Sequence, residues 1–180
     1  ASLAVWPVVG GLLFMLRSLG FAFNEVVVAL LDRPGAYRAL VRFTYLLAAI
    51  VLGITALVAF TPIARLWFSV LSGLGPELTD VARIGFAFAL AWPTLDVVRN
   101  LLQGVVVYGG KTRTIGTSMA LFLVVSAVML LLGVATQRFV ALPYAMVSFV
   151  VATAAQVVWL WRGSLPVLRE LRARGHAAAS

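Results

Sequence analysis

A short apolar stretch of the chain, residues 91–104, carries polar side chains that could bind a charged solute or an ion. They share the i, i+4, i+7, i+8 and i+11 spacing of one helix face, and they are Trp92, Asp96, Arg99, Asn100 and Gln103. Inside a bilayer each charge on such a face costs at least about 2.5 kcal/mol. The face should therefore lie against protein or a water-filled cavity, as the wall of a solute pathway would.

A matching polar stripe occurs near the amino terminus. Arg17, Phe21, Asn24 and Glu25 follow the i, i+4, i+7, i+8 spacing of a helix face. Both stripes run in the same direction through the membrane, so their depths can be compared by counting from the outer end. If the two helices are neighbours, this count predicts that Arg17 pairs with Asp96 and that Glu25 pairs with Arg99.

A purely structural interpretation of these charges is open as well. Asp96 and Arg99 are three residues apart on one helix and could neutralise each other, while Arg17 and Glu25 could extend to the interface if they lie nearer the helix ends. Pro93, just before Asp96, should kink its helix. Bent helices beside charges recur in transporters. Elsewhere, Gln156 is expected to hydrogen-bond a neighbouring helix.

The elements that carry these stripes are predicted to be membrane-spanning helices. The chain has 180 residues, of which 63% are hydrophobic and 11% charged, and its mean hydropathy is +1.06. A spanning helix needs about 20 apolar residues. Five runs qualify: residues 3–31, 43–60, 81–107, 114–135 and 139–161. Their length and lack of strict alternation favour an all-α, polytopic transmembrane helical bundle over a β-barrel.

The basic residues indicate how this bundle is oriented. Nine of the 14 lie in the first gap, the third gap and the tail, against two in the second and fourth gaps. The excess of Lys and Arg in short loops marks the cytoplasmic side. We expect the amino terminus outside, the carboxyl terminus in the cytoplasm and a multi-pass location in the cell (inner or plasma) membrane. A net charge of +8 spread between apolar runs does not indicate nucleic-acid binding.

Two shorter segments are predicted at the membrane surfaces. Residues 63–71 are amphipathic and too short to span, which suits the outer interface. Residues 163–180 form the second part of the chain after the bundle of residues 1–162, and Leu165, Leu168 and Leu171 repeat among arginines there. We expect a basic amphipathic helix on the inner leaflet, although a solvated tail is equally compatible for its last residues.

Signals for enzymatic chemistry and for metal binding are absent from the sequence. There are no cysteines, and the single histidine, His176, lies in the tail. No HExxH, GxSxG or paired catalytic carboxylates occur. The residues before Lys111-Thr112 resemble a P-loop only in part, because Val105 stands where its first glycine would be. We therefore expect neither an enzyme nor a metal site nor a cofactor.

A resemblance to a known family begins at the third run. The pattern Pro93-x5-Arg99-x2-Leu102-x-Gly104 followed by Lys111-Thr112, together with Thr61-Pro62 and Gly73-Leu-Gly75, is similar to the progressive ankylosis family. That family belongs to the multidrug/oligosaccharidyl-lipid/polysaccharide exporter superfamily, which includes the MATE multidrug transporters. The resemblance extends over residues 6–162.

The resemblance implies more than the residues alone do. Family members have twelve spanning helices in two lobes, and the five here would be the last five of the second lobe. The chain begins at Ala1, without methionine. An amino terminus on the outside, with no signal peptide, is expected if at least one spanning helix precedes it in the native protein. We thus expect a piece of a longer protein, whose missing partner is the first lobe or a second copy. Arg99 matches the family's intramembrane arginine, whereas Asp96 does not belong to that pattern.

The sequence thus favours a secondary transporter that moves an anionic or amphipathic small molecule by alternating access. The expected substrate or ion site consists of Arg17, Asn24, Glu25, Asp96, Arg99, Asn100 and Gln103. Arg99 and Arg17 would attract the substrate, and Asp96 or Glu25 would bind a coupling Na⁺ or proton. The alternative is a membrane scaffold or assembly subunit in which the same charges form a structural network.

Overall fold

A computed structural model describes residues 2–18, 20–33, 35–136 and 141–177 of the chain. Helices make up nearly all of this described part, and no strand occurs in it. Five segments are long and apolar enough to cross a membrane: Val5–Leu30, Ala36–Phe60, Pro76–Tyr108, Thr112–Thr136 and Ala141–Leu171. The predicted all-α bundle with five candidate spans is therefore confirmed at this level.

The first of these segments is two helices rather than the single predicted run. Helix α1 (Ser2–Ser18) ends where the Gly20 amide donates to the Arg17 carbonyl at 3.0 Å, and α2 (Phe21–Leu30) begins one residue later. Glycine lowers helix stability by about 1 kcal/mol relative to alanine, which favours a break here. The break follows Ser18, one residue after Arg17, in the apolar middle of the segment.

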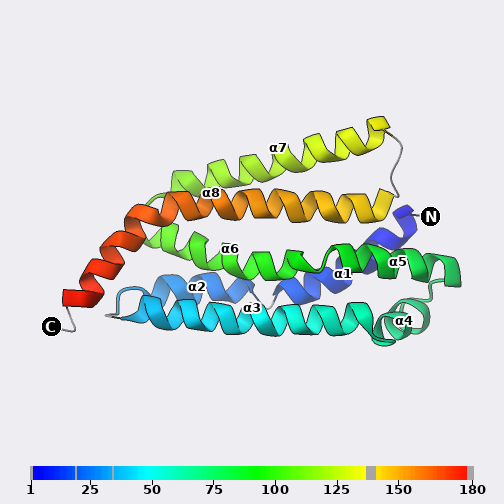
Figure 1. Cartoon of the computed structure of the whole chain (residues 1–180), viewed down its shortest axis with the longest axis horizontal. Coiled ribbons are helices and arrows are strands. Elements are labelled where there is room, and N and C mark those ends of the chain that lie inside the picture. The colour runs from blue at the N-terminus through cyan, green and yellow to red at the C-terminus, as the bar shows by residue number, and fades with distance from the viewer. Residues whose placement is uncertain (1, 19, 34, 137–140, 178–180) are drawn as a thin grey trace.

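The third segment is also interrupted, just before Pro93, where the sequence predicts a kink. Two residues lie between the end of α5 (Pro76–Phe88) and the start of α6 (Ala91–Tyr108). Proline has no amide hydrogen to donate to the carbonyl four residues earlier. That carbonyl, on Ala89, accepts instead from the amide of Trp92 at 2.8 Å. The helix is thus discontinuous at Ala89 and Leu90, about two turns before Asp96, while α5 and α6 keep the same general direction (Figure 1).

The helices lie side by side in a flat bundle (Figure 1). Helix α7 (Thr112–Thr136) forms one edge and packs mainly on α8 (Ala141–Ala177), and α3 (Ala36–Phe60) forms the opposite edge. Helix α6 lies between them, in contact with α2, α3 and α8. This central position makes α6 the helix on which most others converge.

The outer faces of the bundle are strongly apolar. Helix α7 is the most exposed of the candidate spans, with only 6% of its best apolar window buried, and Leu123 and Leu131 on it are 64% and 68% exposed. A water-soluble monomer rarely exposes a contiguous apolar surface of this extent. The exposed surface is compatible with a membrane protein.

The basic segments gather at one end of the bundle. The start of α3, the start of α7 and the last turns of α8 lie together there, and the start of α1 lies at the other end (Figure 1). The gaps that carry most of the basic residues therefore share one side, as the sequence predicted.

Two of the segments predicted at the membrane surfaces differ in detail from their predictions. Residues 63–71 form α4 (Ile63–Arg65) and a π-helix, η1 (Leu66–Leu71), whose Phe68 is fully buried in the bundle. Helix α8 runs without a boundary from Ala141 to Ala177, and Leu168 and Leu171 pack with residues of α2, α3 and α6. The leucine stripe of the tail is thus covered by protein rather than free to lie on the leaflet, because α8 bends past Pro166 toward these helices.

Candidate functional site

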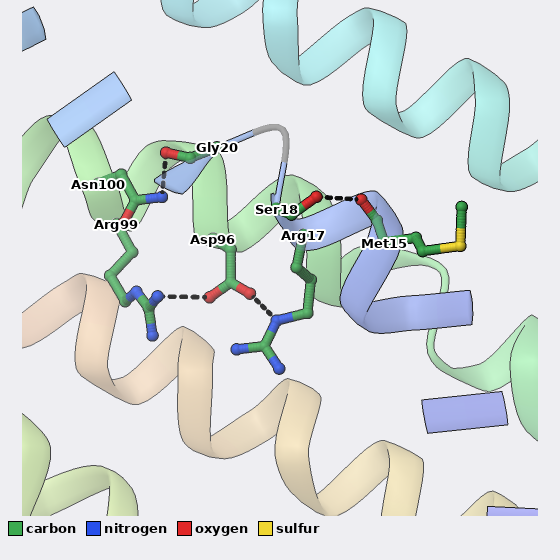
Figure 2. A network of polar contacts seen from close by, with 7 residues as sticks. All are labelled: Met15, Arg17, Ser18, Gly20, Asp96, Arg99 and Asn100. Atoms are coloured by element: carbon green, nitrogen blue, oxygen red, sulfur yellow. Dashed lines mark hydrogen bonds and ion pairs between the residues drawn. The ribbon is translucent and has the colours of Figure 1, made fainter. Parts of the chain in front are cut away.

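The pair predicted between the first and third runs forms in the structure. Arg17, at the end of α1, donates from its Nε to Asp96 Oδ2 on α6 (Figure 2). The Asp96 side chain is fully buried and that of Arg17 is 21% exposed. Counting helical rise from the outer end succeeded here because α1 and α6 pack together and run the same way.

The second predicted pair, Glu25 with Arg99, is wrong. Arg99 lies within 3.2 Å of Asp96 Oδ1, one turn away on the same helix, and Glu25 is exposed on α2. Two physical causes explain the difference. The helix is interrupted at Gly20, between Arg17 and Glu25, so the spacing of one continuous helix no longer determines the direction of Glu25. In addition, the i, i+3 neighbour Asp96 supplies a carboxylate close to Arg99.

Asn100 joins α6 to the break between α1 and α2. Its side-chain nitrogen Nδ2 donates to the Gly20 carbonyl at 2.7 Å, across the gap between α6 and the α1–α2 break (Figure 2). Gly20 allows this approach, since a Cβ there would lie 3.0 Å from Asn100 Nδ2. The sequence placed Asn100 on the stripe but did not predict that it would stabilise a broken helix. The available signal was Gly20, a glycine three residues after Arg17 in an apolar run.

Trp92 lies beneath the Arg17 guanidinium. The Arg17 Cζ atom is 4.4 Å from the centre of the Trp92 ring, a cation–π contact. Trp92 also stacks on Phe149 of α8 at a ring distance of 5.0 Å and an angle of 7°. The helical spacing predicted Trp92 on the stripe. The structure shows that Arg17 contacts both the Trp92 ring and the Asp96 carboxylate.

Asn24 on α2 and Gln103 on α6 complete the predicted set and take no part in the ion pairs of Asp96. Both are half-buried. Asn24 approaches Gly104 of α6 closely, because a Cβ at Gly104 would lie 3.1 Å from Asn24 Oδ1. That oxygen is buried and has no hydrogen-bond partner among the described residues. The α2–α6 contact thus contains an unused acceptor beside Gly104, five residues after Arg99 on α6.

The charge cluster, defined here as Arg17, Asp96 and Arg99, carries a net positive charge. Two guanidinium groups share one carboxylate, which lies between them (Figure 2). Arg99 Nε is buried without a hydrogen-bond partner in the described chain. Guanidinium groups bind carboxylate and phosphate through paired hydrogen bonds. The cluster is therefore suited to an anion, and a cation at Asp96 would have to displace an arginine.

A second buried polar contact joins α7 to α8. Gln156 is 3% exposed, and its Nε2 donates to Ser118 Oγ at 3.3 Å, which confirms the predicted interhelical bond. Gln156 Oε1 and Thr153 Oγ1 are buried and have no partners in the part of the chain that the structure describes. The buried side of α8 is thus more polar than hydropathy alone indicates.

Comparison of the chain with protein-family models, with curated proteins and with solved structures finds no match. The functional argument accordingly rests on the geometry of the charge cluster and its surroundings.

Proposed function

We propose that this chain is part of a secondary transporter that carries an anionic or amphipathic small molecule across a membrane by alternating access. The observation that supports this most strongly is the buried charge cluster between two interrupted helices. Asp96 is fully enclosed, and the breaks at Gly20 and Ala89 lie within about two turns of Arg17 and Asp96. Transporters place substrate sites at such discontinuous helices near the bilayer midplane.

In this proposal the substrate anion competes with Asp96 for the arginines. Arg17 and Arg99 are 21% and 18% exposed, so they are within reach of a solute, while the carboxylate between them is buried. When the site is empty, Asp96 neutralises part of their charge and limits the cost of burying two cations. An arriving carboxylate, phosphate or sulfonate replaces one oxygen of Asp96, and the substrate's apolar part lies among Trp92 and its aromatic neighbours.

In this proposal Glu25, rather than Asp96, binds the coupling Na⁺ or proton. Both Asp96 oxygens face arginines, whereas Glu25 has no ion pair among the described residues and is exposed on α2. In the longer protein that the resemblance to the progressive ankylosis family implies, this exposed carboxylate would face the first lobe across the central cavity. Rocking of the two lobes would then carry the substrate.

The proposal is tested by flux through proteoliposomes that contain the purified chain in its full native reading frame. Each probe anion, namely benzoate, naphthalene sulfonate and phenyl phosphate, is compared with a cationic dye of similar size. We expect uptake of at least one anion and a loss of that uptake in Arg99→Gln and Arg17→Gln, with assembly unchanged. Arg83→Gln is the matched control, because Arg83 lies on α5 and pairs with Asp80 instead.

The alternative of a scaffold or assembly subunit makes a different prediction for the same variants. If the cluster is purely structural, Arg99→Gln should lower folding yield or assembly. The wild-type protein should then carry none of the probe anions.

A further inference from the structure

A groove on the side of the bundle is distinct from the charge cluster. It has a volume of about 600 Å³ and lies between α3 and α8, with α6 as its floor. Its lining is mostly valine and leucine: Val41 on α3, Val98, Leu101 and Leu102 on α6, and Val157, Leu165 and Leu168 on α8. The volume is within the range of about 300 to 1,000 Å³ that is typical of small-molecule sites.

The groove has the length of one membrane leaflet. Along α8 it extends from Val157 to Arg169, which corresponds to about 18 Å at the helical rise of about 1.5 Å per residue. Half of a hydrocarbon core about 30 Å thick is about 15 Å. The groove begins at the basic end of the bundle and stops near the middle, so a chain lying in it would follow a single leaflet.

Charge and aromatic residues mark the end of the groove that lies at the membrane surface. Arg169 is the charged residue of its lining, and Tyr37 in the first turn of α3 lies at the same end. Tyr45 lines both this groove and an adjoining depression that contains Arg38 and Arg42. Tyrosine is favoured at the headgroup level, and basic pockets between spanning helices bind anionic headgroups.

We infer that this groove holds one anionic phospholipid, with an acyl chain between α3 and α8 and its phosphate on Arg169. This inference rests on the chain spanning a bilayer and not on transport. The apolar floor at leaflet depth suits the acyl chain, and the arginine at the headgroup level supplies the complementary charge. The lipid would join α3 to α8 and press on the α6 turn that carries Val98, next to Arg99.

Native mass spectrometry tests the inference directly. The full chain is purified in detergent with equal amounts of phosphatidylglycerol and phosphatidylcholine, and the lipid that stays bound is identified. We expect one phosphatidylglycerol per chain. Arg169→Gln should lower its retention relative to phosphatidylcholine by about fivefold, the effect of one basic residue at a membrane surface. Arg169→Lys should keep most of the preference.

Two further variants distinguish lipid binding in the groove from nonspecific attraction of lipid to the basic end of the bundle. Val41→Phe, which narrows the groove at a half-buried lining residue, should reduce retention of both lipids. Arg162 lies on the same helix but lines a different pocket, next to Arg113. Arg162→Gln should therefore leave lipid retention unchanged. Equal retention of the two lipids, or equal losses in Arg162→Gln and Arg169→Gln, would overturn the inference. So would a lipid-free dimer, which would show that a second copy fills the groove.

Discussion

At the scale of single residues, Asp96 is the residue on which the charge cluster depends. It is the only carboxylate in ion-pair range of Arg17 and Arg99 within the described chain. Removing one partner of a buried ion pair leaves the other charge without compensation. Removing Asp96 alone should therefore lower the free energy of unfolding more than removing all three charges of the cluster.

The first prediction follows from this imbalance. Asp96→Asn should lower the free energy of unfolding by about 3 to 5 kcal/mol, because two guanidinium groups stay buried with no carboxylate. The triple variant Arg17→Met, Asp96→Leu, Arg99→Met should be more stable than Asp96→Asn. Unfolding of the purified chain in detergent measures both. A triple variant that is the less stable of the two would show that the charges do more than neutralise one another.

Residue spacing predicted one of the two ion pairs and not the other, for identifiable reasons. The depth of Arg17 and Asp96 depends only on helical rise, which is nearly constant along α1 and α6. The partner of Glu25 depends also on the break at Gly20, across which the spacing of one continuous helix no longer determines direction. The cation–π contact of Arg17 with Trp92 depends on side-chain orientation, which the spacing of residues does not determine.

At the scale of helices, the α2–α6 contact depends on glycine. A Cβ at Gly104 would lie 2.6 Å from Val27 Cγ1, which forces α2 away from α6. Sequence periodicity identified α6 as a helix, yet it gave no measure of how close its neighbours come. Close approach of this kind is a property of the packed pair of helices.

The second prediction uses this contact. Gly104→Ala should destabilise the chain by about 1 to 3 kcal/mol, the usual cost of overpacking. Gly116→Ala is the matched control, because a Cβ at Gly116 of α7 would have no neighbouring atom within 4 Å, and its replacement should be neutral or slightly stabilising. Thermal unfolding of the two variants in one detergent decides the matter. Equal shifts would contradict the close contact.

The third prediction concerns the helix break. Asn100→Ala removes the donor to the Gly20 carbonyl and should cost about 1 to 3 kcal/mol if that oxygen is left unsatisfied. The loss should be local, with faster hydrogen exchange of amides in residues 20–24. Gln103→Ala, on the same stripe but without a bond to Gly20, should leave that exchange unchanged. Unchanged exchange in Asn100→Ala would mean that the break is held by other contacts.

At the scale of the whole molecule, the distribution of basic residues predicts how the bundle sits in the membrane. Hydropathy and loop charge were sufficient to predict five helical segments long and apolar enough to span a membrane, and the gathering of basic segments at one end. They did not predict that the first span is broken, because that break lies inside a continuous apolar run. They also missed the packing of Leu168 and Leu171, which depends on the bend of α8.

The fourth prediction is the orientation itself. The chain has no cysteine, so single cysteines can be introduced for labelling. Thr112→Cys, at the basic end, should be protected from a membrane-impermeant maleimide in intact cells, and Glu77→Cys, at the start of α5, should react. The opposite pattern would place the amino terminus inside.

The central claim is that the polar stripe of α6 lines a pathway open to water, as a transporter requires. Its most direct test is the reaction of Gln103→Cys with a charged thiol reagent in membranes. Leu131→Cys, exposed on α7, is the lipid-facing control. A pathway predicts that Gln103→Cys reacts, that Leu131→Cys does not, and that a transported anion slows the reaction. Failure of Gln103→Cys to react in the folded protein would contradict the claim and favour a dry structural network.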